Sequence, residues 1–346
     1  MTAPVRHTAA SRRDGIVLVV VLFFILLLTS AMAVFLRRAA LDAGIATHRD
    51  RARTAESLAR GGVRLGETLL LEDLRLKGAD ASSPDSLHDV WARVRGVDLD
   101  DDPDVELHVD VEDATARFDL NGFLEKGEVS ADKRALIEQM LAGVIAIMPG
   151  TPDEHSHYEP DVLAANLADW IDADDVTAEG EPEDDLYARR DPPYRVPNRP
   201  LLSVDELRLV DGFDGPLVDA LRPFVGVYPL VGGGGVNVNT APPWVLAQLS
   251  KGSDVSGFRP LAEDDVKRIV EAREEGPLCS GQTPAPTCQP LAELLDGATL
   301  SPPPVERSNV FRITAVAKVF DVERRVETVV DRSKPASLER LSWRVQ

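Results

Sequence analysis

The N-terminal part of the sequence lacks charged residues in one stretch and proline in a longer one, although a soluble domain normally contains both. No charged residue occurs from Ile16 to Leu36, a run of 21 residues. A helix of that length crosses a bilayer core of about 30 Å. The run is longer than the apolar centre of a secretory signal peptide and no small-x-small site follows it, which argues against a removable signal. No proline occurs between Pro4 and Pro84, so a single helix can extend well beyond the membrane.

Basic residues are scarce outside the N-terminal part of the chain. Residues 1–78 contain 12 Lys and Arg and 7 Asp and Glu, which gives this part a charge of +5. Because the whole chain has a net charge of −20, residues 79–346 carry −25. Binding to nucleic acid depends on neutralising phosphates with Lys and Arg, so this composition argues against a nucleic-acid partner. An acidic body is compatible with a cation site or with basic partners.

A leader with three arginines ends in a glycine directly before the apolar run. The order of basic leader, Gly15 and apolar helix resembles the type IV pilin and pseudopilin signal. In that family the prepilin peptidase, a membrane enzyme, cuts after the glycine and the new N-terminus is methylated. The resemblance implies a leader peptide at 1–15, a cut between Gly15 and Ile16, and a transmembrane helix at 16–36. The alternative is an uncleaved single-pass anchor.

The helical pattern continues past the apolar run. Small and apolar residues recur at helical spacing through residues 37–77, and Gly78 with Asp80 offers a stop signal. We therefore expect one helix from Ile16 to Lys77 whose second half is amphipathic. A plain anchor followed by coil would leave the apolar stripe from Ala52 to Leu71 unexplained.

Alternating residues near both ends of the remaining chain predict a small antiparallel sheet. Residues 105–111 alternate apolar and acidic, and we expect a hairpin with a second strand at 114–120. Residues 309–319 and 324–330 also alternate, with a turn at Phe320-Asp321. The first part of the sheet then lies in 78–120, the final hairpin in 307–332 and a C-terminal tail in 333–346.

The segment between these strands, 121–306, is too long to be a loop and is predicted to be an inserted, mainly helical domain. Helices are expected at 132–148, 161–171, 244–249 and 263–274, and another after the N-capping Ser203. Residues 236–276 resemble a helix-hairpin-helix unit. Their surroundings are acidic and would repel a phosphate backbone, so we interpret the unit as a packing module.

Five short motifs, which follow one another along the chain, carry a more specific resemblance. They are Phe118–Asn121 (FDLN), Asp169–Asp174 (DWIDAD), Glu183–Tyr187 (EDDLY), Leu202–Leu207 (LSVDEL) and Val236–Ala241 (VNVNTA). Together with the leader, the series is similar to the type II secretion system minor pseudopilin K family (general secretion pathway protein K), and it covers nearly the whole chain. The resemblance implies an α+β fold, in which a pilin-like long N-terminal helix packs on a small antiparallel sheet that carries a large helical insertion.

The resemblance also implies a function and partners. The family is not enzymatic and lies at the tip of the type II secretion pseudopilus, where it supports protein export across the outer membrane. The implied partners are other minor pseudopilins in a tip complex, the prepilin peptidase, the inner-membrane secretion platform and membrane lipid. The implied topology is a single pass through the inner membrane with the C-terminal body in the periplasm.

The fifth residue after the expected cut supports a tip position. Most pilins carry a glutamate there, whereas this chain has Val20. A carboxylate in the lipid centre costs on the order of 2.5–3.5 kcal/mol and needs a partner. In pilins that partner is thought to be the N-terminal amine of the subunit ahead, which a terminal subunit does not have. Ordinary membrane anchors also carry valine at such positions.

The acidic loop at 169–185 is the candidate cation site. Its carboxylates suit Ca²⁺, which takes six to eight oxygen ligands, and members of the family hold calcium. The expected ligands are Asp172, Asp174, Glu183 and Asp184. The spacing does not match an EF-hand, and the alternative is a solvated acidic loop.

The only two cysteines, Cys279 and Cys288, are close together in a proline-rich segment. They are expected to form a disulfide if the body lies outside the cytoplasm, and a pair of free thiols is the alternative.

Two other functions compete with the pseudopilin hypothesis. A membrane-anchored enzyme is one, although no nucleophile–base pair, HExxH motif or phosphate loop is legible, and no catalytic residue is expected. A tethered helix-hairpin-helix protein that captures DNA is the other.

Overall fold

The computed structural model of the chain describes residues 14–77, 83–94, 97–98, 104–177, 180–230, 234–252, 258–280, 288–334 and 337–346. Most of the expected leader, residues 1–13, lies outside the described residues.

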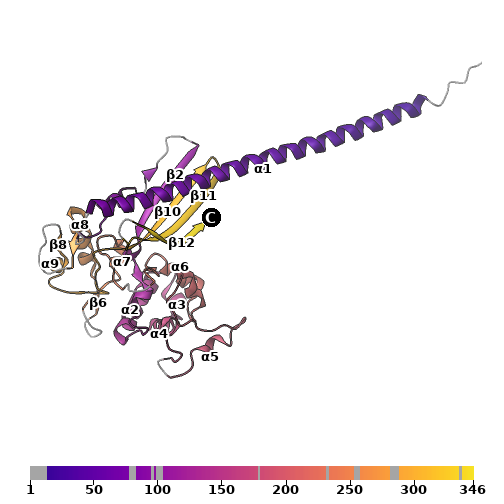
Figure 1. Cartoon of the computed structure of the whole chain (residues 1–346). Coiled ribbons are helices and arrows are strands. Elements are labelled where there is room, and N and C mark those ends of the chain that lie inside the picture. Colours follow the sequence, from indigo (N-terminus) through magenta and orange to yellow (C-terminus); the bar gives the residue numbers. More distant parts are fainter. Residues whose placement is uncertain are drawn as a thin grey trace, which may run out of the picture.

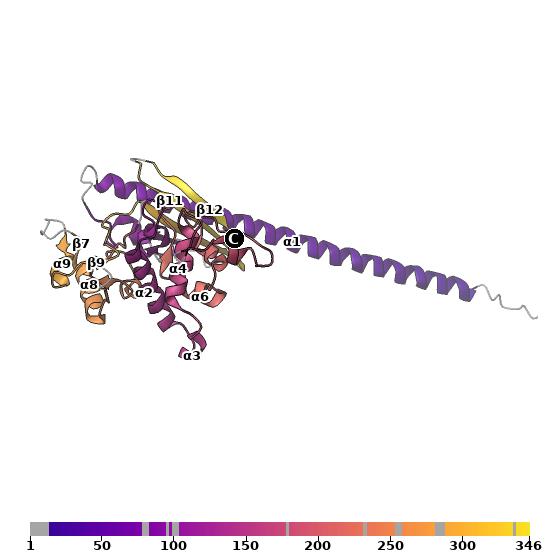
Figure 2. The ribbon, with the colours of Figure 1, turned by 90° about the horizontal axis from the view of Figure 1, so that it is seen from below.

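One helix, α1 (Asp14–Lys77), contains the expected membrane-spanning segment and continues into the body. Its apolar first half is exposed along its whole length and projects away from the rest of the molecule (Figures 1 and 2). In its second half one side is buried against the sheet, where Ala55, Ala59, Val63 and Leu70 are fully covered. The expected continuous helix is therefore present. Its surface is apolar on all sides in the first half, and beyond residue 50 it is apolar only on the side that packs against the sheet.

Two glycines allow α1 to approach the sheet closely. A Cβ atom added at Gly62 would lie 2.8 Å from a methyl group of Val109, and one added at Gly66 would lie 2.7 Å from a methyl group of Ile313. Glycine inside a helix costs about 1 kcal/mol relative to alanine. The close contact between helix and sheet explains why glycine occupies these two positions.

The sheet has five antiparallel strands in the order β1-β2-β10-β11-β12. They are β1 (Val97–Asp98), β2 (Val105–Asp113), β10 (Val310–Val319), β11 (Val322–Asp331) and β12 (Glu339–Val345). Strands β10 and β11 form the expected hairpin around Phe320-Asp321. Alternate residues of β10 are buried against α1, so the other face of the sheet is turned away from the helix.

The expected hairpin between residues 105–111 and 114–120 is wrong. The chain leaves the sheet after β2, through the short 3-10 helix η2 (Ala114–Ala116), because the Asp113 carboxylate accepts hydrogen bonds from the Thr115 backbone N–H at 2.8 Å and from its hydroxyl at 2.7 Å. The neighbours of β2 are instead β1 and β10. The following strand, β3 (Phe118–Asp119), pairs with β4 (Val225–Gly226) of the insertion.

The segment 333–346 is not a tail, since it contributes the edge strand β12. Thr328 lies opposite Trp343, and its hydroxyl donates to the Ser342 carbonyl at 2.7 Å. The alternation of Leu341, Trp343 and Val345 was the available signal for this strand.

The insertion consists of short helices and strands around its own apolar core. Its further elements are η3 (Leu120–Phe123), α2 (Ala131–Ile147), α3 (Pro152–His155), α4 (Pro160–Ile171), α5 (Asp184–Tyr187), η4 (Val204–Leu209), α6 (Gly215–Leu221), α7 (Pro243–Leu246), β5 (Ser250–Lys251), β6 (Arg259–Pro260), α8 (Glu263–Glu275), β7 (Leu278–Cys279), β8 (Gln289–Pro290), α9 (Leu291–Leu294) and β9 (Leu300–Ser301); η1 (Val90–Val94) precedes it.

Helices α2, α4 and α8 match three of the expected helices, whereas two others are shorter than expected. Ser203 caps the 3-10 helix η4 instead of an α-helix, and α7 is a single turn. In the helix-hairpin-helix-like segment, residues 236–276, strands β5 and β6 occupy the place of a simple hairpin between α7 and α8.

Candidate functional sites

The exposed half of α1 is the first candidate functional surface. Within the described residues it is the one helix long and apolar enough to cross a membrane. Ile16 is 66% exposed, and the expected cleavage bond between Gly15 and Ile16 lies in the first turn of α1. Fully exposed apolar residues over this length require lipid or other helices as partners.

A second candidate site lies where α4 ends and α5 begins. Asp169 is in the last turn of α4, Asp172 is the residue that ends the helix, and Glu183 directly precedes α5. The loop between them folds back on itself, with a β-bridge between Val176 and Pro182. This return places carboxylate oxygens of Asp169, Asp172 and Glu183 within 4.8 Å of one another.

The carboxylates of this cluster, which we call the acidic triad, repel one another. Burial, followed by the charges of Asp174, Asp169 and Glu128, raises the pKa of Asp172 to about 7. Burial, followed by the charges of Asp172 and Asp169, raises the pKa of Glu183 to about 8. One oxygen of Asp172 and both oxygens of Glu183 are buried without a hydrogen-bond partner among the described residues.

These unpartnered oxygens suit a hard cation. Buried polar atoms normally have partners, and a carboxylate that lacks one is stabilised by a proton or by a metal ion. The donor set is all oxygen, as Ca²⁺ requires. Asn198 lies against the same loop, donates to Asp175 Oδ1 at 2.9 Å, and has a buried carbonyl oxygen without a partner among the described residues.

Two of the four expected ligands, Asp172 and Glu183, belong to the acidic triad. Asp174 accepts a hydrogen bond from the Val176 N–H at 2.9 Å, and Asp184 accepts one from the Val196 N–H at 3.0 Å. The structure does not group either carboxylate with the triad. Sequence reasoning did not select Asp169, although its spacing of three residues from Asp172 at a helix end places both on one side of the chain.

A second cluster of buried carboxylates lies where α1 ends, and it is neutralised by basic residues. The Arg332 guanidinium lies 2.8 Å from an Asp73 oxygen and 2.6 Å from an Asp85 oxygen. The Lys77 ammonium lies 2.5 Å from Asp85 and 2.7 Å from Asp89. Despite burial, which acts in the opposite direction, Arg332 and Lys77 hold the pKa of Asp85 below its usual value. This basic-acidic cluster joins α1, the segment after it and the end of β11, and it needs no metal.

The two cysteines are joined in the structure. A disulfide links Cys279 at the end of β7 to Cys288, with 5.7 Å between their Cα atoms. Strand β8, which directly follows Cys288, lies near α8 and α9 and away from α5 (Figure 1).

The fold and these sites define a class of protein. A helix that is apolar and exposed in its first half, and packed on an antiparallel sheet in its second half, is the architecture of a pilin-like protein with one membrane-anchoring helix. The inserted domain distinguishes this chain from a minimal pilin-like body.

Comparisons with known proteins support one family within this class. The family model described as type II secretion system (T2SS), protein K matches residues 116–230. Type II secretion system protein K of Pseudomonas aeruginosa is 37% identical over 203 residues, which are 57% of this chain and 56% of that protein. The protein of the same name from Aeromonas hydrophila is 33% identical over 198 residues, 54% of each chain. The chain thus matches little more than half the length of these relatives.

A solved structure supports the fold. A chain of the crystal structure of the GspK-GspI-GspJ complex from the enterotoxigenic Escherichia coli type 2 secretion system matches with a TM-score of 0.57 and 20% identity. The match covers 86% of this chain and 99% of that chain. These matches support the resemblance to the type II secretion system protein K family, and the predicted α+β fold with a pilin-like helix is confirmed.

Proposed function

We propose that this chain is a minor pseudopilin at the tip of a type II secretion pseudopilus, anchored in the inner membrane by residues 16–36 with its body in the periplasm. The observation that carries the proposal is the division of α1 into an exposed apolar half and a half packed on the sheet. Such a helix can pass from lipid into a bundle of similar helices without refolding, because its apolar surface is covered in either place.

The proposed tip position has two further supports. The insertion adds a second core beside the pilin-like body, which makes the body bulkier than a single pilin-like core. The fifth residue after the expected cut is Val20, which has no charge that would require a subunit ahead. The GspK-GspI-GspJ complex motivates the proposal that the partners are other minor pseudopilins.

The proposed role is structural rather than enzymatic. The DNA-capture alternative is not favoured, since α8 of the helix-hairpin-helix-like segment begins with Glu263, Asp264 and Asp265. Acidic side chains at a helix N-terminus oppose the approach of phosphate.

We further propose that the acidic triad holds a calcium ion. Asp169, Asp172 and Glu183 would provide the carboxylate ligands, and the ion would supply the positive charge that compensates their mutual repulsion. The ion would thereby fix the end of α4 to the start of α5.

Mass spectrometry of the mature N-terminus tests the proposed function. The full-length chain is purified from cells with an active prepilin peptidase, and we expect it to begin at a methylated Ile16. Gly15→Val is expected to leave the leader attached, whereas Asp14→Asn serves as a control with a change beside the cut and normal processing. Recovery of wild-type chain that still begins at Met1 would contradict the proposal.

A further inference from the structure

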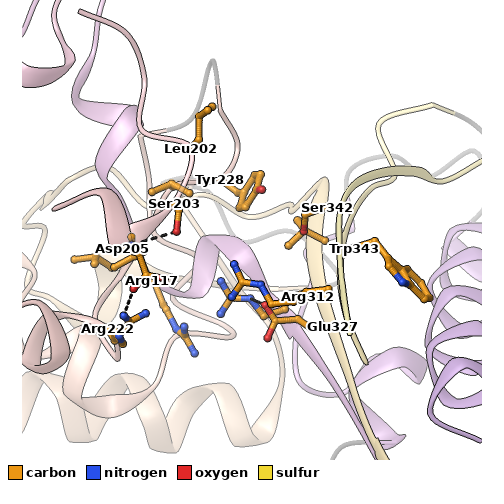
Figure 3. Close-up of a pocket in the computed structure, with 15 residues that line it drawn as sticks. Arg117, Leu202, Ser203, Asp205, Arg222, Tyr228, Arg312, Glu327, Ser342 and Trp343 are labelled. Atoms are coloured by element: carbon orange, nitrogen blue, oxygen red, sulfur yellow. Dashed lines mark hydrogen bonds and ion pairs between the residues drawn. The ribbon is translucent and has the colours of Figure 1, made fainter. Parts of the chain in front are cut away.

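A crevice separates the outer face of the sheet from the inserted domain, and it lies on the side of the sheet opposite α1. It has a volume of about 330 Å³, within the range of ligand pockets. Arg312 on β10, Val329 on β11 and Ser342 on β12 lie opposite one another and form its floor. Figure 3 shows Arg117, Arg222 and Tyr228 on the insertion side, facing Arg312 and Glu327 on the sheet.

The lining of this crevice is basic in a strongly acidic chain. It holds four arginines and two carboxylates, whereas the whole chain has a net charge of −20. Two of the arginines are bound to carboxylates nearby: Arg117 donates to both oxygens of Glu112 at 3.2 Å, and Arg222 pairs with Asp205 and Asp219.

The other two arginines have unused donors. Arg312 forms long ion pairs with Glu112 at 3.7 Å and with Glu327 at 3.9 Å, and both distances are too long for a hydrogen bond. The Arg312 Nε atom is buried without a hydrogen-bond partner among the described residues. Arg344, opposite Glu327 on β12, has no ion pair with a described residue. A guanidinium carries five N–H donors arranged to bind a carboxylate through two parallel bonds.

Apart from Ser203 and Ser342, the remaining lining is apolar, and this restricts the class of ligand that the crevice can bind. Val204, Val225 and Val227 on the insertion and Val329 on the sheet add aliphatic surface, and Tyr228 adds a ring. A ligand that complements both the arginines and the apolar surface carries carboxylates and apolar groups together, as a peptide does. A lipid headgroup is out of reach, because Gly66, which faces Ile313 beside Arg312, lies about 45 Å along α1 from the end of the apolar run at Leu36.

We propose that this crevice binds an acidic peptide segment of another protein, whose carboxylate is held by Arg312 and Arg344 against the apolar wall. The crevice faces away from α1, so it stays open when the exposed side of α1 packs against other helices. Charge complementarity with a basic crevice selects acidic segments over basic ones.

Peptide binding by the full-length chain in detergent micelles tests the proposal. The probe is the blocked peptide acetyl-Ala-Asp-Val-Glu-Ala-amide, and its uncharged counterpart is acetyl-Ala-Asn-Val-Gln-Ala-amide. We expect the acidic peptide to bind at least about tenfold more tightly than the amide peptide, and its binding to weaken as salt rises. Isothermal titration calorimetry measures both affinities.

Substitutions in the crevice provide the second measurement. Arg312→Gln and, separately, Arg344→Gln are expected to weaken binding of the acidic peptide by about tenfold, and Arg312→Lys by less, since lysine keeps the charge but loses the two-bond geometry. Arg324→Gln, which removes an arginine on β11 outside the crevice, is the matched control and is expected to change affinity by less than about twofold. Thermal melts show that each variant is folded.

Three results would overturn the proposal. They are equal binding of the acidic and amide peptides, unchanged binding in both folded crevice variants, and inorganic phosphate or succinate binding as tightly as the peptide, which would indicate a site for small anions. None of them bears on the position of the mature N-terminus, so this proposal and the proposed function fail independently.

Discussion

The two groups of buried carboxylates in this protein differ in how their charge is balanced. At the end of α1, Asp73 and Asp85 contact Arg332 and Lys77 directly. In the acidic triad no described lysine or arginine forms an ion pair with Asp172 or Glu183, and their pKa values rise to about 7 and about 8. Similar side chains thus contribute to tertiary structure in one place and form a candidate cation site in the other.

An acidic cluster therefore indicates a metal site only when no neighbouring lysine or arginine already neutralises its carboxylates. Both clusters meet the geometric condition for a metal site, since both bring three carboxylates together. The basic-acidic cluster already contains the positive charges that a metal would supply. Among the described residues, Asp172 and Glu183 of the acidic triad have no basic partner of this kind, so they depend on protons or on an ion.

The largest expected effect comes from removing the central cation of the basic-acidic cluster. Arg332→Met keeps the aliphatic stem but leaves Asp73 and Asp85 buried without that partner. Breaking a buried ion pair by removing one side costs about 3–5 kcal/mol, and we expect a loss of this size in the free energy of unfolding. Urea denaturation of the full-length chain in detergent, followed by tryptophan fluorescence, measures it. Arg324→Met, on β11 and outside the cluster, is the control, with an expected change below about 0.5 kcal/mol.

The next largest effect concerns calcium and the acidic triad. With free calcium at about 100 times its Kd, a single bound ion stabilises the folded state by about 2.7 kcal/mol, which EDTA would remove. Glu183→Gln removes one of the repelling charges, so we expect this variant to be more stable than the wild type in EDTA and to gain little from calcium. Thermal melts with calcium and with EDTA measure both effects.

Glu181→Gln is the matched control for the triad. Glu181 is exposed on the same loop, two residues before Glu183, and its loss is expected to leave the calcium response intact. A wild-type melt that is identical in calcium and in EDTA would show that the acidic triad holds no calcium.

A single buried carboxylate, Asp119, is expected to make the stability of the protein depend on pH. Burial raises the pKa of Asp119 to about 7, and one of its oxygens has no hydrogen-bond partner among the described residues. The folded state therefore binds a proton that the unfolded state releases near pH 4, so stability falls as the pH rises through 7. We expect a loss of about 2 kcal/mol between pH 5.5 and 8 from this group.

Asp119→Asn should remove this pH dependence. Its side-chain oxygen can still accept the hydrogen bond from the Asn121 N–H, which is 3.0 Å long in the wild type. Denaturation curves of both proteins at a series of pH values measure the difference. If the wild type and the variant lose stability in parallel as the pH rises, Asp119 is not the titrating group.

The smallest expected effect belongs to an ion pair at the surface. Arg340 on β12 donates to both oxygens of Glu67 on α1, at 2.7 and 3.0 Å. Exposed pairs contribute about 0.2–1 kcal/mol and weaken in salt. We therefore expect Arg340→Gln to lower the free energy of unfolding by less than about 1 kcal/mol, and by less still in 1 M salt. A loss comparable to that of Arg332→Met would show that exposure does not explain the difference between the two arginines.

Local patterns predicted the elements that are long or strongly periodic. The run from Ile16 to Leu36 and the stripe beyond it gave α1, and the alternation around Phe320-Asp321 gave the hairpin of β10 and β11. These predictions succeeded because burial on one side of a helix or strand imposes a period on the sequence. Where the element is a single turn, as at α7, no such period exists.

Other features depend on contacts between distant residues. The hairpin expected after β2 is wrong because Asp113 turns the chain and β10, about 200 residues later, takes the place beside β2. Likewise Arg332 is far from Asp73 in the chain, and no pattern near either residue indicates their pairing.

From the sequence alone we could predict the membrane-length apolar helix, the positions of the main strands and helices of the chain, and the resemblance to the protein K family. These are local or periodic properties of the chain. Only the tertiary structure decided which carboxylates are neutralised, which arginines keep unused donors, and where the last strand lies. The reason is physical: a charge's environment depends on the groups that folding brings within a few ångströms, and those groups come from distant parts of the chain.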